Sequence, residues 1–361
     1  MKLKFLLTLS LWLPLFGDSH NQRFQYNPKP YQFESNHLTL IHTENLTLYE
    51  TSEIENINTD FKDIYKLYGI IYQRYSYKPT STLSFGYFDK AESFIKANKG
   101  FIRGTYIVSN TNDGLEIAPN QIFEVEANGL YYKTNGLYLE QKIDKFIIKL
   151  AAHNLKELQN ITIDGYGYDD EQGIRTDIFI DYFYSTKNYI LKNESFSKGR
   201  TLDGEGYSVD LGYEDRYENL IYGFGRENLL SKIDVQNMPS LYLSLSNIDR
   251  LYTGTDGYKH SNALLNGMYL YRDFSFEMPT TDYIFLENEK NYGIVWSKIA
   301  NEIENIYVYY YLNKKLKLGY SDIDKLFDFE YFGKNYSISM STNVRDINNY
   351  YGVNFGFRLR Y

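Results

Sequence analysis

Residues 351–361 read YGVNFGFRLRY, and this stretch alternates strictly between two kinds of side chain. Every odd-numbered position is apolar or aromatic, whereas every even-numbered position is Gly, Asn or Arg. Because successive side chains of a β-strand point to opposite faces, the pattern predicts a strand that separates two different media. Its apolar face would meet either a protein core or lipid.

The same period of two recurs along the chain. On one face of residues 174–184 it places Ile174, Thr176, Ile178, Ile180, Tyr182 and Tyr184. Similar rows occur at 207–213, 241–245, 316–320 and 336–340, and further strand candidates at 64–77, 100–108, 120–127, 219–225 and 304–312. Gly, Asn and Asp cluster between the rows, as in tight turns. No convincing long helix is predicted, so the chain is expected to be all-β and antiparallel.

The composition narrows the class of protein. Tyr (39 residues) and Phe (23 residues) raise the aromatic fraction to 18%, and Tyr suits the boundary between lipid tails and headgroups. The net charge of -8, scattered without blocks, argues against a nucleic-acid partner. The absence of Cys excludes disulfides, thiolate metal sites and a lipid-anchored cysteine. We expect no cofactor and no metal.

The N-terminus has the features of a secretory signal peptide. Lys2 and Lys4 precede the 12-residue apolar run FLLTLSLWLPLF, and small residues follow at 17–19. Twelve residues are too few for a transmembrane helix, which needs about 20. We therefore predict that residues 1–19 are removed on export, and that any membrane-spanning part of the remaining chain is built of strands.

The last eight residues carry a more specific resemblance. Bacterial outer-membrane β-barrels end in a signal that the barrel-assembly machinery recognises: a polar residue, a Gly two positions later, an apolar residue and a terminal aromatic. Asn354, Gly356, Leu359 and Tyr361 fill these positions. The chain thus resembles a Gram-negative outer-membrane β-barrel protein, porin-like but of no specific family.

This resemblance implies an antiparallel transmembrane β-barrel with short periplasmic turns, located in the bacterial outer membrane. The length remaining after cleavage would give about 14–18 strands, an even number. We expect residues 63–361 to form the barrel, and residues 20–62 to form a periplasmic extension, a plug or the first strands. The expected partners are outer-membrane lipid, lipopolysaccharide and the assembly machinery, and a homotrimer is an open alternative.

If the apolar rows face lipid, the charged residues that alternate with them face the lumen. The set predicted to face inward consists of Arg175, Asp177, Asp181, Asp210, Lys315, Lys317, Arg358 and Arg360. Rings of like charge select ions, but this set mixes both signs. Salt bridges across the lumen are the simpler interpretation.

One sequence feature bears on catalysis. Outer-membrane phospholipases and lipid A deacylases carry a His and a Ser one residue apart on a strand, followed by Asn. Here His260 and Ser261 are adjacent and Asn262 follows. Adjacent strand residues point to opposite faces, so the imidazole could not activate the hydroxyl in that manner. A polar loop explains the tripeptide better.

Three functions remain open at this point. A passive channel for small hydrophilic solutes, which is not an enzyme, is the first choice, because the expected strand number leaves an aqueous lumen. The first alternative is an outer-membrane lipid hydrolase that uses His260 and Ser261. The second is a non-catalytic barrel scaffold or a component of an envelope export system.

Overall fold

The computed structural model describes residues 32–45, 61–109, 122–170, 173–185, 202, 204–246, 251–253, 259–261, 264–288, 292–313, 315–322, 326–342 and 352–360. Strands dominate these residues, and the one helix among them is α3 (Lys99–Ser109), which follows β3. The strands are β1 (Gln32–Glu44), β2 (Ile64–Lys78), β3 (Leu83–Asn98), β4 (Ile122–Ile143), β5 (Phe146–Asp170), β6 (Gly173–Tyr184), β7 (Gly204–Tyr217), β8 (Leu220–Ser246), β9 (Leu251–Thr253), β10 (Lys259–Ser261), β11 (Leu264–Phe276), β12 (Thr281–Asn288), β13 (Tyr292–Ile299), β14 (Ile303–Asn313), β15 (Leu316–Ser321), β16 (Leu326–Phe332), β17 (Tyr336–Thr342) and β18 (Gly352–Arg360).

The strands form a closed antiparallel barrel. Successive pairings lead from β1 through β2, β3, β4, β5, β7, β8 and β12, and then through β13 to β18 in order. The first strand, β1, pairs with β18, which closes a ring of 14 strands. The predicted fold class, including the strand number, is therefore confirmed.

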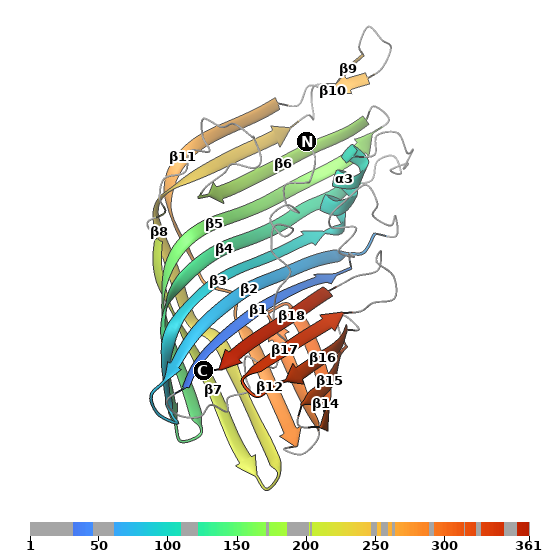
Figure 1. The fold of residues 1–361 in the computed structure, drawn as a ribbon. Helices are drawn as coiled ribbons and strands as arrows, with labels where there is room; N and C mark the ends of the chain where they lie inside the picture. The colour runs from blue at the N-terminus through green and yellow to red at the C-terminus, as the bar shows by residue number, and fades with distance from the viewer. Residues whose placement is uncertain are drawn as a thin grey trace.

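Two further strands extend the wall beyond this ring. β6 pairs with one part of β5 and β7 with another, so β6 and β7 lie end to end between β5 and β8. On its other side β8 pairs with β12 near its start and with β11 near its end. The wall is consequently much taller on this side than at β15–β17, as Figure 1 shows.

The two ends of the barrel differ in their connections. At one end β2–β3, β4–β5, β7–β8, β12–β13, β14–β15 and β16–β17 are joined by only two to four residues. At the other end 19 residues separate β1 from β2 and 23 separate β3 from β4. The C-terminal end of β18 lies at the end with the short turns (Figure 1). Outer-membrane barrels have the same asymmetry, with short turns on the periplasmic side.

The face that points away from the ring is largely apolar. Leu137 on β4 and Phe327 on β16 are 66% and 68% exposed, and many other large apolar side chains are exposed along the strands. In β18 Phe355 and Phe357 are half-buried, whereas Gly356 and Arg358, which alternate with them, are buried. An apolar band around the outside of a closed barrel is the surface that hydrocarbon tails require. Within the described residues, no helix is long and apolar enough to cross a bilayer.

The prediction of a strand at 100–108 was wrong, because this segment forms α3. Asn98 ends β3 and caps the helix, its Oδ1 accepting a hydrogen bond of 2.9 Å from the backbone N–H of Phe101. Such a cap satisfies a donor that has no partner within the helix. The apolar residues of the segment suit a helix packed on a sheet as well as a strand.

The helix covers part of the outer face. Its residues Phe101 and Ile102 pack in one apolar cluster with Ala127 of β4, Ile163 of β5 and Tyr182 of β6. Of the row predicted to contact lipid at 174–184, the described side chains of Tyr182 and Tyr184 are buried in this cluster. The expectation that this row contacts hydrocarbon was therefore wrong for these two residues.

The first strand of the ring lies within residues 20–62. Gln32–Glu44 forms β1, paired with both β2 and β18, so the described part of this segment matches the first strands, one of the three alternatives expected for it, and residue 63 is not the start of the barrel. The segment reads as polar because Glu34 and Asn36 face the inside of the ring. Residues 1–31, which include the predicted signal peptide, lie outside the described residues.

The outward position of Leu137 gives a test of the membrane assignment. Replacing Leu137 with Arg should destabilise the barrel by about 2–4 kcal/mol in lipid vesicles, because the charge would be placed in hydrocarbon. Denaturant unfolding of the refolded protein measures the change, with Leu137→Ala as the control for lost apolar area. Equal stability of the Arg and Ala variants would contradict a lipid-facing position.

Candidate functional site in the barrel lumen

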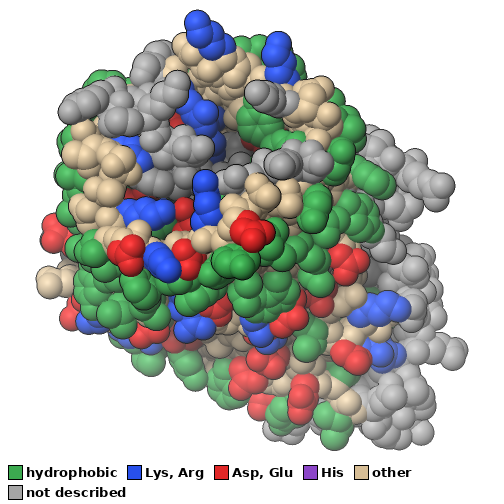
Figure 2. Space-filling model, turned by 90° about the horizontal axis from the view of Figure 1, so that it is seen from below, with side chains coloured by type: hydrophobic (Ala, Val, Ile, Leu, Met, Phe, Trp, Pro, Cys, Tyr) green, Lys and Arg blue, Asp and Glu red, His purple; other side chains and the backbone are tan. Residues whose placement is uncertain are grey.

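The interior of the ring contains a cavity of about 120 Å³. Seen from below, the molecule shows charged side chains around a hollow (Figure 2). The cavity is lined by Asn36, Leu38, Ile70, Tyr72, Arg74, Phe88, Lys90, Glu140, Ile147, Lys149, Ala151, His153, Ser208, Asp210, Leu211, Gly212, Arg226, Glu227, Asn228 and Tyr283. These residues come from strands on both sides of the ring, so the cavity occupies the lumen itself.

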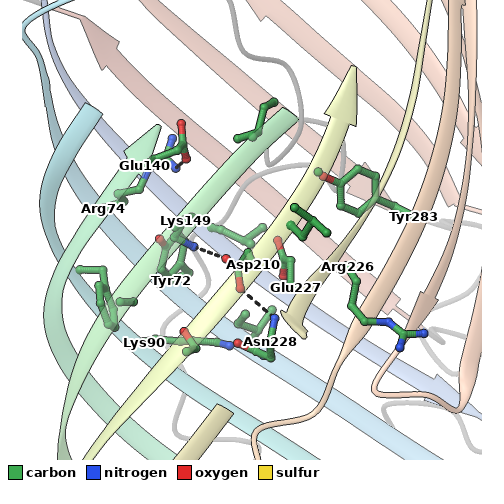
Figure 3. A pocket seen from close by; sticks show the side chains of 18 of the residues that line it. Tyr72, Arg74, Lys90, Glu140, Lys149, Asp210, Arg226, Glu227, Asn228 and Tyr283 are labelled. Atoms are coloured by element: carbon green, nitrogen blue, oxygen red, sulfur yellow. Dashed lines mark hydrogen bonds and ion pairs between the residues drawn. The ribbon is translucent and has the colours of Figure 1, made fainter. Parts of the chain in front are cut away.

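Two ion pairs are built into this wall. Lys149 lies 2.8 Å from Asp210, which also accepts a hydrogen bond of 2.8 Å from the backbone N–H of Asn228 (Figure 3). Lys90 lies 2.6 Å from Glu92, a buried carboxylate. Buried charges are tolerated when they are paired and hydrogen-bonded, and both pairs meet this condition.

Arg74 is held less tightly than the lysines. Its guanidinium lies 3.9 Å from Glu140 and 4.0 Å from Glu34, both beyond hydrogen-bond distance. Glu34 is also approached by Arg358 at 3.5 Å and Arg360 at 3.4 Å. Three guanidinium groups therefore share one carboxylate near the short-turn end of the lumen.

A histidine and a serine meet beside the cavity. His153 Nε2 lies 2.9 Å from Ser208 Oγ, and His153 Nδ1 lies 3.4 Å from Thr134 Oγ1. The ring of Phe88 packs against the imidazole at 4.9 Å between centroids. No carboxylate is hydrogen-bonded to Nδ1 among the described residues, so the orienting group of a hydrolytic triad is missing there.

A second polar group lies inside β14–β17. Lys317 and Glu330 form a fully buried ion pair, and Tyr307 donates a hydrogen bond to Asp328. Ser341 donates a further hydrogen bond of 2.7 Å to Asp328. This half of the lumen is thus filled by buried polar side chains.

The turn between β13 and β14 crosses the lumen. Ile299, Ala300 and Ile303 pack in one apolar cluster with residues of β1 and β2, including Leu38 and Tyr68. These strands lie on a distant part of the ring, so the turn is a bridge between two walls. It narrows the space through which a solute could pass.

Charged contacts fix the same turn at its tip. Lys66 of β2 donates a hydrogen bond of 3.1 Å to the backbone carbonyl of Glu302, and Lys96 of β3 donates one of 2.8 Å to the Glu302 carboxylate. The hydrogen bond from Lys96 lowers the pKa of Glu302 below its ordinary value. We call this contact of Glu302 with Lys66 and Lys96 the lumen latch.

Four of the residues predicted to face inward line the inside of the ring. Asp210 lies in the cavity wall, Lys317 is buried against Glu330, and Arg358 and Arg360 flank Glu34. Leu318, next to Lys317, is 41% exposed, as the alternation requires, whereas Leu211, next to Asp210, also lines the cavity because the strand register shifts there.

The other four residues of that set occupy different positions. Asp181 lies in the extension of the wall above the ring and pairs with Arg272 of β11. Asp177 belongs to the same strand, β6. Lys315 is exposed in the β14–β15 turn, where no strand alternation applies, so its predicted place in the lumen wall was wrong. The side chain of Arg175 lies outside the described residues.

The predicted assembly signal coincides with the closing strand. Asn354 and Gly356 pair with Leu40 and Leu38 of β1, and Leu359 pairs with Ser35. Tyr361 lies outside the described residues. The position is compatible with a signal that is read before the ring closes, and this role stays a prediction.

The predicted catalytic candidates, His260 and Ser261, lie away from the lumen wall. His260 and Ser261 belong to β10, which pairs only with β9 in a separate two-stranded sheet among the described strands. Their adjacent positions give no shared face. Among the described residues, no group of three or more His, Asp and Glu side chains could hold a metal ion.

Sequence reasoning missed most of the cavity. Arg74, Lys149 and Glu140 were not singled out, because both alternate rows of their strands contain large apolar residues. In β2, for example, the inward row holds Ile70 and Tyr72. Only the pairing of strands shows which row faces the lumen.

Solved outer-membrane barrels align with most of the chain. A mutant of TodX, the toluene transporter of Pseudomonas putida, is 13% identical, with 93% of this chain and 90% of that chain covered and a TM-score of 0.43. The translocator domain of autotransporter NalP from Neisseria meningitidis is 5% identical, with 94% and 91% covered and a TM-score of 0.35. The outer-membrane protease OmpT from Escherichia coli is 12% identical, with 94% and 99% covered and a TM-score of 0.23.

These likenesses are too distant to assign a function, since every one of the three TM-scores lies below 0.5. No protein-family model and no curated protein matches the sequence.

The buried ion pair of β15 and β16 generates a stability prediction. Replacing Glu330 with Gln leaves the Lys317 charge buried without its counter-charge, and should destabilise the barrel by about 3–5 kcal/mol. The double variant Lys317→Met, Glu330→Leu should recover most of that loss. Denaturant unfolding in vesicles measures both, and a Glu330→Gln variant as stable as the wild type would show that the pair is not buried.

Proposed function

We propose that the protein is a bacterial outer-membrane β-barrel that acts as a passive channel for small hydrophilic solutes. The observation that supports this most is the charged cavity inside a closed ring whose outer face is apolar. Such a barrel offers a polar path between two aqueous compartments. Passage down a gradient needs neither a cofactor nor a chemical step.

The lumen geometry limits the size of the solute. The cavity of about 120 Å³ is small, and the β13–β14 turn crosses the ring beside it. The channel we propose is accordingly narrow and favours small molecules over general diffusion of large ones. The ion pairs in its wall would exchange protein partners for solute contacts as molecules pass.

Export, assembly and lipid contacts of the barrel are part of the same proposal. Residues 1–19 would direct export, and residues 354–361 would be recognised by the barrel-assembly machinery. The apolar band would contact outer-membrane lipid and lipopolysaccharide. A homotrimer is compatible with this arrangement, since channels of this class often associate in threes.

Planar-bilayer recording of the purified, refolded protein tests the channel. We expect discrete, small, ohmic steps in potassium chloride, with heat-modifiable migration on a gel as the control for folding. Bilayers that stay sealed at high concentrations of folded protein would reject the channel. Lipid release by the same preparation, lost in a His260→Ala variant, would instead support the hydrolase alternative.

The lumen latch gives a second electrical prediction. Replacing Glu302 with Gln removes the charge that Lys96 and Lys66 hold, so the turn should detach more often and raise the mean single-channel conductance. Lowering the pH should act in the same direction, because protonation of Glu302 below its depressed pKa breaks the same contact. Glu304→Gln, on the exposed part of β14, is the matched control. Identical conductance in both variants and the wild type would show that the latch does not restrict the path.

A further inference from the structure

The cavity contains a guanidinium group whose hydrogen-bonding capacity is not used. Arg74 Nε is buried and makes no hydrogen bond to the part of the chain that the structure describes. The side chain is only 17% exposed, and its two carboxylate neighbours lie at 3.9 and 4.0 Å. A buried donor without an acceptor is costly, so such a group in a native protein calls for an explanation.

The local charge favours an additional anion. Arg74, Arg358 and Arg360 surround Glu34, and Glu140 is the second carboxylate near Arg74. Three positive groups therefore face two negative ones, at separations too long to satisfy Arg74. A carboxylate entering here could accept two parallel hydrogen bonds from the guanidinium fork, which is the geometry that Arg recognises best.

The other charges of the wall are already engaged. Lys149 is bound to Asp210, and Lys90 is bound to Glu92, each at 2.8 Å or less. Figure 3 shows Arg74 and Glu140 on one side of the cavity, apart from the Lys149–Asp210 pair. Arg74 is thus the cation of this wall with the most capacity for a solute.

The remaining wall near Arg74 fits the rest of such a molecule. Leu38, Ile70, Phe88 and Ala151 line the cavity with apolar surface. Asn36, which also lines it, has a buried side-chain oxygen without a hydrogen-bond partner among the described residues. A carboxylate with a small apolar group could therefore pair with Arg74 and contact the apolar side chains of the wall.

We infer that Arg74 forms a recognition site for a small monocarboxylate with a short apolar or aromatic group, and that this class of solute is what the lumen selects. The inference rests on the proposed channel function and adds the substrate class. Arg74 would bind the carboxylate and Leu38, Ile70 and Phe88 would contact the apolar part. Neutral molecules of the same shape would lack the anchor.

Single-channel recording of the wild-type protein in potassium chloride tests the inference with three probes. Sodium benzoate should reduce the chloride-carrying current in a saturable manner, and its neutral isostere benzamide should not. Inorganic phosphate is the third probe, because it shares the anionic charge but has no apolar group, and it should block more weakly than benzoate. Equal effects of benzoate and benzamide, or phosphate as strong as benzoate, would overturn the assignment.

Variants of Arg74 then locate the site. Arg74→Gln should raise the half-blocking benzoate concentration by about ten-fold or more, as expected for the loss of charge-assisted hydrogen bonds. Arg74→Lys keeps the charge without the planar guanidinium, so its half-blocking benzoate concentration should lie between those of the wild type and Arg74→Gln. Arg272→Gln is the matched control, because Arg272 pairs with Asp181 outside the cavity lining. A shift in the control equal to that of Arg74→Gln would refute the site.

The outcomes separate the two proposals. A folded protein that never conducts contradicts the channel, whereas a conducting channel that does not distinguish benzoate from benzamide contradicts only the carboxylate site. If Arg74→Gln does not give the heat-modifiable band of a folded barrel, the comparison of the three probes on the wild-type protein still decides.

Discussion

The structure depends on the pairing of its first and last strands. β1 and β18 are antiparallel from Glu34 opposite Arg360 to His42 opposite Gly352. Without this contact the sheet would have two open edges, and in hydrocarbon each unpaired backbone group costs several kcal/mol. Closure therefore creates both the apolar exterior and a separate interior. The same contact brings Arg358 and Arg360 of β18 next to Glu34 of β1, so this cluster of charges is a direct consequence of closing the ring.

Once the ring is closed, its interior must satisfy many polar groups in little space. One half is filled by buried pairs, Lys317 with Glu330 and Tyr307 with Asp328. The other half keeps a cavity, in which Lys149 and Lys90 are closely paired and Arg74 is not. This contrast explains why the cavity, and not the filled half, is the candidate site. A lumen filled by side chains along its whole length would leave no space for a solute.

The sequence predicts local alternation well and long-range placement poorly. The strand at 352–360 was predictable because Phe355 and Phe357 alternate with Gly356 and Arg358 over several residues. The segment 100–108 was not, since the decisive feature is a cap by Asn98 rather than a period. The position of Arg74 in the lumen wall was not predictable for another reason: its row also contains Tyr72 and Ile70, so no difference in polarity marks the lumen side. The contact of Glu302 with Lys66 and Lys96 could not be predicted, because the sequence of a three-residue turn does not show whether the turn points into the lumen or away from it.

The geometry of the cavity depends finally on an irregularity that no alternation pattern contains. The register of β7 against β8 shifts between Val209 and Leu211, and in the bulged part of β8 that lies opposite Asp210, Asn228 adopts a positive φ of 54°. Asn tolerates this backbone conformation better than most residues, and the bulge turns its N–H toward Asp210, 2.8 Å away.

The same arrangement recurs in β8 at Asn237, which also has a φ of 54°. Its N–H donates a hydrogen bond of 2.9 Å to Asp273, beside the register shift between β8 and β11. Because only the first of these bulges lies in the ring, it is the one that orients an acid into the lumen, where Asp210 pairs with Lys149 at 2.8 Å. A regular β8 would leave Asp210 without its backbone donor, and the carboxylate that pairs with Lys149 would lose that support.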